Sequence, residues 1–103
     1  PAVLRRGELV VALSTSGAAP ALAVRLKERL ARLFPEAYGE LVAFLRTLRP
    51  RIAQIPSFEE RKRLWYRIVD QALEELDLDP REGLGRAKEK AEEALKEVAA
   101  WTR

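Results

Sequence analysis

One short run of apolar residues constrains this chain most, because it predicts a β-strand and the rest of the sequence offers only one short stretch to pair with it. Residues Leu9–Leu13 are all apolar and contain β-branched Val10 and Val11, as in a strand covered on both faces. The segment Ala2–Arg5 is a second short apolar stretch, and Arg6-Gly7 between the two suits a tight turn. We therefore expect a β-hairpin at the start of the chain.

The sequence after this hairpin predicts helices. The first is expected from about Pro20 to Phe34, the second from about Glu36 to Ile55, and the fourth from about Pro80 to Trp101. A capping-box pattern over residues 57–60 starts the third. Pro50 lies inside the second helix and is expected to kink or split it. The expected fold class is α+β, mostly α: an N-terminal β-hairpin followed by about four helices. Turns are expected at Pro35, at Pro56-Ser57 and over Leu76–Pro80, where Asp79 can act as an N-cap.

Apolar side chains at helical spacing are expected to face a core on each helix. The last helix has a narrow face that contains alanines and would permit close packing. The expected faces are Leu22, Leu26, Leu30 and Leu33 on the first helix; Leu41, Phe44, Leu45, Leu48 and Ile52 on the second; Phe58, Leu64, Trp65, Ile68, Val69, Leu73 and Leu76 on the third; and Leu84, Ala87, Ala91, Leu95, Val98 and Trp101 on the fourth.

A hairpin of two strands is marginally stable in water by itself, and its unpaired edges invite aggregation unless something covers them. Helices of the same chain can cover one face of the hairpin, but they cannot supply a row of strand hydrogen bonds. We therefore expect the strands to pair with a second copy of the chain, with a missing domain, or with both.

The composition excludes several classes of function. The 103 residues contain no cysteine and no histidine, which removes disulfides, thiolate chemistry and structural zinc. Nothing implies an oxidising compartment, so a cytoplasmic location is expected. No apolar run approaches the length of a membrane span. Asparagine and methionine are also absent while arginine, glutamate and leucine abound, which fits a thermophilic source.

The loop Ser14–Ala19 is the main candidate binding segment. Backbone amides, hydroxyl groups and the positive end of the helix that begins at Pro20 converge there, as in an anion-binding cradle. Alternatively, the hydroxyls cap their own backbone in an ordinary strand–helix connection. The loop matches neither a Walker motif nor Gly-x-Gly-x-x-Gly. Arg5 and Arg6, which flank the hairpin turn, are either solvent-exposed arginines or ligands of the same anion.

A basic surface offers an alternative function. The formal net charge is +3, and the cluster Glu59–Arg63 precedes Trp65 and Tyr66, which could stack on bases. A helical interaction module or a small nucleic-acid binder is therefore the second hypothesis. Acidic residues are interleaved with the basic ones, however, which favours a solvated helix face over a nucleic-acid surface.

Residues 1–23 resemble the segment that follows the NAD-binding domain in siroheme synthases. The shared pattern is a proline and small residues, Arg6-Gly7 with Leu9, an apolar strand, a Ser-Thr-Gly loop, and a helix that opens Pro20–Ala23. The stretch Glu59–Trp65 resembles the charged and aromatic part of the family's helical tail. Two residues depart from the pattern, because Ser16 replaces a glycine and Ala19 replaces a serine N-cap worth about 1 kcal/mol.

The resemblance implies the dimerisation and tetrapyrrole-facing region of a precorrin-2 dehydrogenase. Residues 1–35 would form the hairpin and first helix of the dimerisation region, and residues 36–103 a helical region. Members of the family are homodimers that oxidise precorrin-2 to sirohydrochlorin with NAD, and many also insert ferrous iron as a ferrochelatase, a lyase activity, to give siroheme. By position, the residues implied to border the tetrapyrrole or to meet its carboxylates are Ser14, Thr15, Ser16, Gly17, Arg5 and Arg6.

The resemblance places no catalytic residue, metal ligand or cofactor site in this chain. The family's catalytic aspartate and its glycine-rich nucleotide fingerprint both lie upstream of Pro1, so the NAD-binding domain is missing. We therefore expect that the chain does not carry out the dehydrogenation alone. It is either a fragment of a longer enzyme or a subunit that pairs in trans with a separate nucleotide-binding protein.

Overall fold

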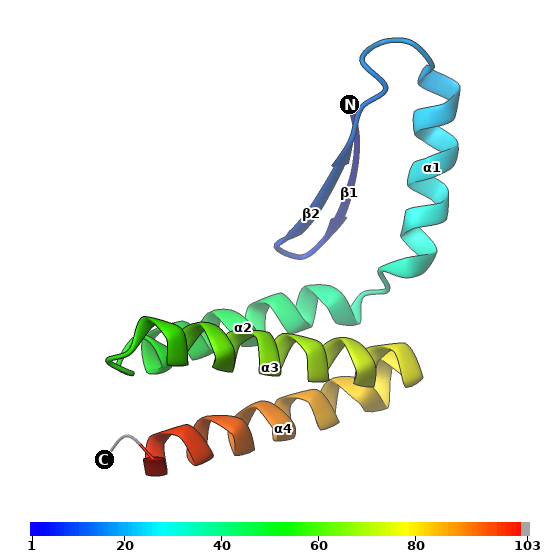
Figure 1. The fold of residues 1–103 in the computed structure, drawn as a ribbon. Coiled ribbons are helices and arrows are strands. Elements are labelled where there is room, and N and C mark those ends of the chain that lie inside the picture. Colours follow the sequence, from blue (N-terminus) through cyan, green and yellow to red (C-terminus); the bar gives the residue numbers. More distant parts are fainter. Residues whose placement is uncertain (102–103) are drawn as a thin grey trace. The chain divides into compact units, whose positions relative to one another are not determined.

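The computed structural model describes the backbone of residues 1–101 and the side chains of residues 1–100. It confirms a hairpin followed by four helices, an α+β fold that is mostly α (Figure 1). The chain divides into two compact units, Pro1–Ala43 and Phe44–Arg103. The side chain of Trp101, expected on the apolar face of the last helix, lies outside the described residues. The elements are β1 (Ala2–Arg6), β2 (Leu9–Leu13), α1 (Pro20–Leu33), α2 (Ala37–Ile52), α3 (Phe58–Leu78) and α4 (Pro80–Trp101).

The hairpin of the first unit is antiparallel, and its register pairs Ala2 with Leu13 and Arg6 with Leu9. Gly7 opens the turn with φ +58°, a conformation that glycine adopts without strain. Residues 1–101 do not by themselves cover β2 on both faces, since burial alternates along the strand and Val10 is 46% exposed. The reason is that β1 and β2 form the whole sheet in residues 1–101, and the helix that packs against it is α1.

Helix α1 packs against β1 through only part of the expected stripe, in which Leu26 and Leu30 are half-buried. Its fully buried residue is Ala23, whereas Leu22 and Leu33 of the expected stripe are 51% and 63% exposed. The small alanine brings the helix close to the hairpin and turns these two leucines outward. The first unit therefore presents apolar side chains that its own residues leave open.

The hairpin turn also lies very close to the first turn of α2. A Cβ atom placed on Gly39 would lie 2.5 Å from the backbone oxygen of Arg6. The Arg6 guanidinium donates to carbonyl oxygens at the end of α1, from Nε to Phe34 at 2.6 Å and from Nη2 to Ala31 at 3.3 Å. These carbonyls have no partner within the helix, so Arg6 satisfies backbone groups that would otherwise need water.

The second unit has a continuous apolar core contributed by α2, α3 and α4. As expected from the periodicity, Leu48, Leu64 and Ile68 are buried. The expected burial of Phe58 and Leu73 is wrong, because these side chains are 66% and 40% exposed on the outer side of α3. The core cluster consists of Leu48, Ile52, Ile55, Leu64, Ile68, Ala91, Ala94 and Leu95, with Phe44, Leu45, Trp65 and Val98 packed against it.

The helix ends follow local capping signals. The Ser57 side chain accepts from the backbone N–H of Glu60, as its capping-box position predicts. Asp79 Oδ1 accepts from two backbone N–H groups of α4, which confirms it as an N-cap. The turn expected over Leu76–Pro80 is wrong in length, since α3 continues to Leu78 and Asp79 alone separates it from α4. Pro50 does not split α2, which continues past it to Ile52.

A buried carboxylate joins α3 to α4. Glu75 is 6% exposed, and its two oxygens accept from Lys90 Nζ at 2.8 Å and from Arg86 Nε at 2.5 Å. The hydrogen bond from Lys90, followed by the one from Arg86, holds the pKa of Glu75 below its ordinary value of 4.5. The charged form of this residue is therefore the one that stabilises the junction.

We expect the thermal midpoint to fall as the pH decreases below about 4.5, because the unfolded Glu75 carboxyl then binds a proton that the folded one still excludes. The stabilisation is fully present above that pH and is lost as the pH falls through the lowered folded pKa. Circular-dichroism melts of the wild type and Glu75→Gln across the acid range measure it. The variant should show a shallower acid decline than the wild type. Equal slopes for the two proteins would contradict the role of the Glu75 carboxylate.

Candidate functional site

A hollow of about 330 Å³ lies in the first unit, at the open end of the hairpin where β2 passes into α1. Three of the expected site residues, Ser14, Thr15 and Gly17, line it. We call it the loop hollow; its full lining is Pro1, Ala2, Leu13, Ser14, Thr15, Gly17, Pro20, Ala23 and Val24.

The loop that borders this hollow is a tight turn with two residues in the left-handed region. Ser16 has φ +57° and Gly17 has φ +79°, and the backbone N–H of Ala18 donates to the oxygen of Thr15 at 3.1 Å. Two consecutive positive φ values inside such a hydrogen bond are typical of a type I′ turn. Ser16 therefore occupies, at a cost in strain, a conformation that glycine adopts freely.

The loop hydroxyls first satisfy their own backbone. Ser14 Oγ accepts from the N–H of Ser16, and Thr15 Oγ1 accepts from the N–H of Ala19, both at 3.1 Å. This is the arrangement that the ordinary strand–helix interpretation predicts. Each hydroxyl still has its own hydrogen to donate. The N-cap residue of α1, Ala19, makes no side-chain hydrogen bond, and the first turn holds no acidic residue, so the positive helix end is left uncompensated by the protein there.

The structure does not bring all six expected residues together. Arg5 and Arg6 lie at the turn end of the hairpin, whereas Ser14 follows the other end of β2. Four residue steps along a strand separate the two ends by roughly 13 Å. Arg6 is also engaged with carbonyl oxygens of α1, while Arg5 is exposed. The loop hollow thus contains the hydroxyl part of the expected site without its arginines.

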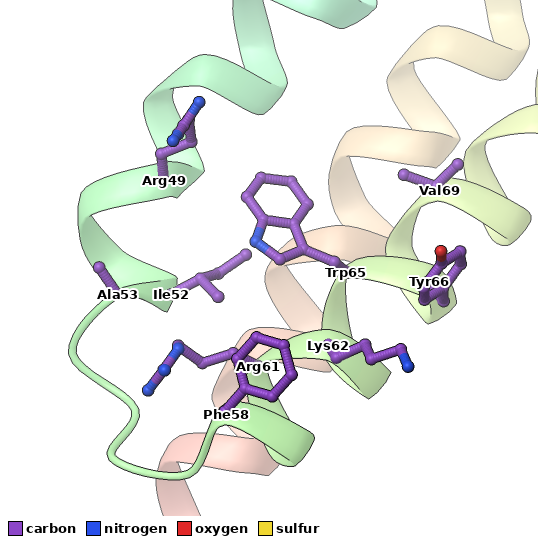
Figure 2. A pocket seen from close by; sticks show the side chains of 9 residues that line it. All are labelled: Arg49, Ile52, Ala53, Phe58, Arg61, Lys62, Trp65, Tyr66 and Val69. Carbon is purple, nitrogen blue, oxygen red and sulfur yellow. The ribbon is translucent and has the colours of Figure 1, made fainter.

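A larger groove in the second unit was not found by sequence reasoning. It has a volume of about 580 Å³ and lies along α3 and the end of α2 (Figure 2). The only signal was the cluster Glu59–Arg63 with Trp65 and Tyr66, which suggested a basic surface. We call this feature the aromatic groove; its lining is Arg49, Ile52, Ala53, Phe58, Arg61, Lys62, Trp65, Tyr66 and Val69.

The described residues do not fit a dinucleotide cofactor. Such a site needs a glycine-rich loop between a strand and a helix, but the loop after β2 contains a single glycine, Gly17, and Gly83 and Gly85 lie inside α4. Within residues 1–101, no group of three or more acidic side chains is placed to hold a metal ion. None of the described helices is long and apolar enough to cross a membrane.

The strained turn gives a first prediction about this site. Gly17→Ala is expected to lower the free energy of unfolding by about 1 kcal/mol, although a Cβ there would meet no atom within 4 Å, because the cost lies in the positive φ. Ser16→Gly removes the same kind of strain and should stabilise by about 0.5 kcal/mol, since greater freedom of the unfolded chain offsets part of the gain. Urea unfolding measures both. Destabilisation by Ser16→Gly would contradict this geometry.

Two protein-family models match separate parts of the chain. The sirohaem synthase dimerisation region matches residues 37–99, and the central region of sirohaem biosynthesis proteins matches residues 6–33. The loop hollow lies mostly in and beside the second match, and the aromatic groove lies wholly inside the first.

Individual relatives that match this chain are named siroheme synthase. The siroheme synthase of Thioalkalivibrio sulfidiphilus is 38% identical over 92% of this chain, and that of Methylococcus capsulatus is 38% identical over 96%. The alignments cover only 19% and 20% of those relatives, so the chain spans about a fifth of their length. A solved structure named SirC, a precorrin-2 dehydrogenase, is 32% identical with a TM-score of 0.63, over 86% of this chain and 46% of that one.

Proposed function

Because this chain belongs to the siroheme synthase family, we propose that it is the self-associating, tetrapyrrole-facing part of a precorrin-2 dehydrogenase acting in siroheme biosynthesis. In this proposal the nucleotide domain, the NAD and the catalytic aspartate come from outside these residues. The dehydrogenase assignment is supported by the likeness to SirC, of which this chain covers 46%. A cytoplasmic location is part of the proposal and is supported by the lack of cysteine.

The open hairpin is the observation that carries self-association. Its sheet has the order β1-β2 within residues 1–101, so each strand has one edge whose backbone groups pair with no other strand of the described chain. Val10 projects from the hairpin at 46% exposure, and Leu22 and Leu33 project from α1. A soluble domain that leaves both strand edges and such apolar side chains open is expected to cover them with another polypeptide. A second copy is the partner that the dimerisation-region match supports.

The loop hollow supports contact with a tetrapyrrole. Precorrin-2 and sirohydrochlorin carry eight carboxylates, and carboxylates accept from hydroxyl groups and from the N–H groups at the start of a helix. Ser14 and Thr15 retain hydroxyl hydrogens to donate, and the first turn of α1 contains no acidic residue to repel the ligand. The loop would therefore orient the substrate by its carboxylates, and it holds no group here that could take a hydride or a proton from carbon.

A titration of the chain with sirohydrochlorin, followed by absorbance, tests this role. Val24 and Leu22 are both 51% exposed on α1, but only Val24 lines the loop hollow. Val24→Glu should weaken binding about tenfold, since it sets a carboxylate against the ligand's own, while Leu22→Glu should change it little. Equal effects of the two substitutions would contradict the assignment of the loop hollow as the tetrapyrrole site. NAD-dependent oxidation of precorrin-2 by the chain alone would also contradict the proposal.

A further inference from the structure

The aromatic groove of the second unit has an apolar floor. Ile52 is 1% exposed and Trp65 packs against the same core cluster, so both are fixed by the surrounding helices. Figure 2 shows the Trp65 indole extending from α3 toward α2, where Arg49 and Ile52 line the opposite side of the groove. A wide, rigid indole at the base of a groove offers a flat surface on which a planar ring can lie.

Two further aromatic rings lie at the rim of the groove and are exposed, outside the apolar core. Phe58 is 66% exposed and Tyr66 is 62% exposed, two turns further along α3. Phe58 is held in place, because the Arg61 guanidinium carbon lies 5.9 Å from its ring centroid and Arg61 Nη1 donates to the backbone oxygens of Ile55 and Pro56 at 2.5 and 2.9 Å. The rim therefore combines a fixed aromatic ring with a fixed cation.

The charge of the groove has one sign. Its nine lining residues include Arg49, Arg61 and Lys62 and no acidic side chain. Elsewhere in the second unit, two arginines are neutralised by ion pairs, Arg51 with Glu92 and Arg67 with Glu97. In the described part of the chain, Arg49 and Lys62 make no ion pair.

We propose that the aromatic groove binds a planar aromatic molecule that carries several negative charges. The ring system lies against Trp65 and beside Phe58, and its anionic substituents meet Arg49 and Lys62 at the two sides. The volume of about 580 Å³ falls within the range of small-molecule sites. This site shares no lining residue with the loop hollow, and it does not depend on the function proposed above.

Fluorescence anisotropy of pyrene-1,3,6,8-tetrasulfonate, a planar aromatic tetra-anion, tests the groove. The chain should bind the probe with a dissociation constant below about 1 mM at low salt, and added salt should weaken binding. Lys62→Glu should weaken it about tenfold, and Phe58→Ala about tenfold through lost stacking. Lys96→Glu on α4 makes the same change in net charge away from the groove and should leave binding nearly unchanged.

Three results would overturn the groove as a ligand site. The first two are no binding of the probe, and equal effects of Lys62→Glu and Lys96→Glu. A third is a loss of self-association in Phe58→Ala with unchanged probe binding, which would identify the rim as a contact between copies. The variants separate this proposal from the preceding one. Sirohydrochlorin binding that responds to Lys62→Glu and not to Val24→Glu would refute the loop hollow while supporting the aromatic groove.

Discussion

Gly83→Ala is expected to lower the free energy of unfolding by about 3 kcal/mol, the upper part of the range for overpacking. Asp79 is the whole connection between α3 and α4, so the first turn of α4 lies directly on the last turns of α3. A Cβ atom on Gly83 would overlap the carbonyl oxygen of Glu75 and lie 2.6 Å from its carbonyl carbon. Both are backbone atoms, so relief requires the two helices to separate.

The neighbouring glycine is a matched control for this substitution. Gly85 lies on the same helix, and a Cβ there would meet no atom within 4 Å. Gly85→Ala should therefore raise the free energy of unfolding by about 1 kcal/mol, because alanine is the better helix former. Urea unfolding followed by circular dichroism measures both variants. Two changes of the same sign would show that the helix junction differs from the one described.

Gly39→Ala is expected to destabilise the first unit by about 2 kcal/mol through a similar clash. Its Cβ would lie 2.5 Å from the backbone oxygen of Arg6 and 2.7 Å from the carbonyl carbon. The hairpin turn must then move from α2, which disturbs the position from which Arg6 reaches the end of α1. Glu40→Ala, at the next and exposed position of α2, should change stability by less than about 0.5 kcal/mol. Hydrogen exchange of the β1 and β2 amides should accelerate in Gly39→Ala, and unchanged exchange would refute the close approach.

Local signals in the sequence predicted the elements and most of their ends. The turn residue Gly7, the N-caps Ser57 and Asp79, and the proline that opens α1 act on backbone groups within a few residues. Such interactions involve residues that are close in sequence, so the hairpin and the four helices could be predicted from the sequence pattern alone. The error at Leu76–Pro80 has the same origin, because an N-cap shows where α4 begins but not how far α3 continues.

Contacts between distant segments could not be predicted in this way. Periodicity showed that Phe58 and Leu22 lie on apolar helix faces, but it does not say which part of a face meets another element. Gly39 and Gly83 had no visible role, since each depends on a backbone atom from another element. A glycine in a helix predicts only a loss of helix propensity until its neighbour is known.

The two candidate sites differ in the same way, because one is formed by neighbouring residues and the other by residues from distant segments. Ser14, Thr15 and Gly17 line one hollow because they are consecutive in one loop, and a loop can be recognised from sequence. The aromatic groove needs Arg49 from α2 beside Trp65 from α3, which are brought together only by helix packing. The sequence indicated its charge and its aromatic rings, without the concave surface that turns them into a binding site.

Sedimentation equilibrium of the wild-type chain over a range of concentrations tests self-association most directly. The open edges of β1 and β2 predict a species of twice the chain mass of 11.7 kDa at micromolar concentrations. A folded species that remains at 11.7 kDa up to the highest concentrations would contradict the account.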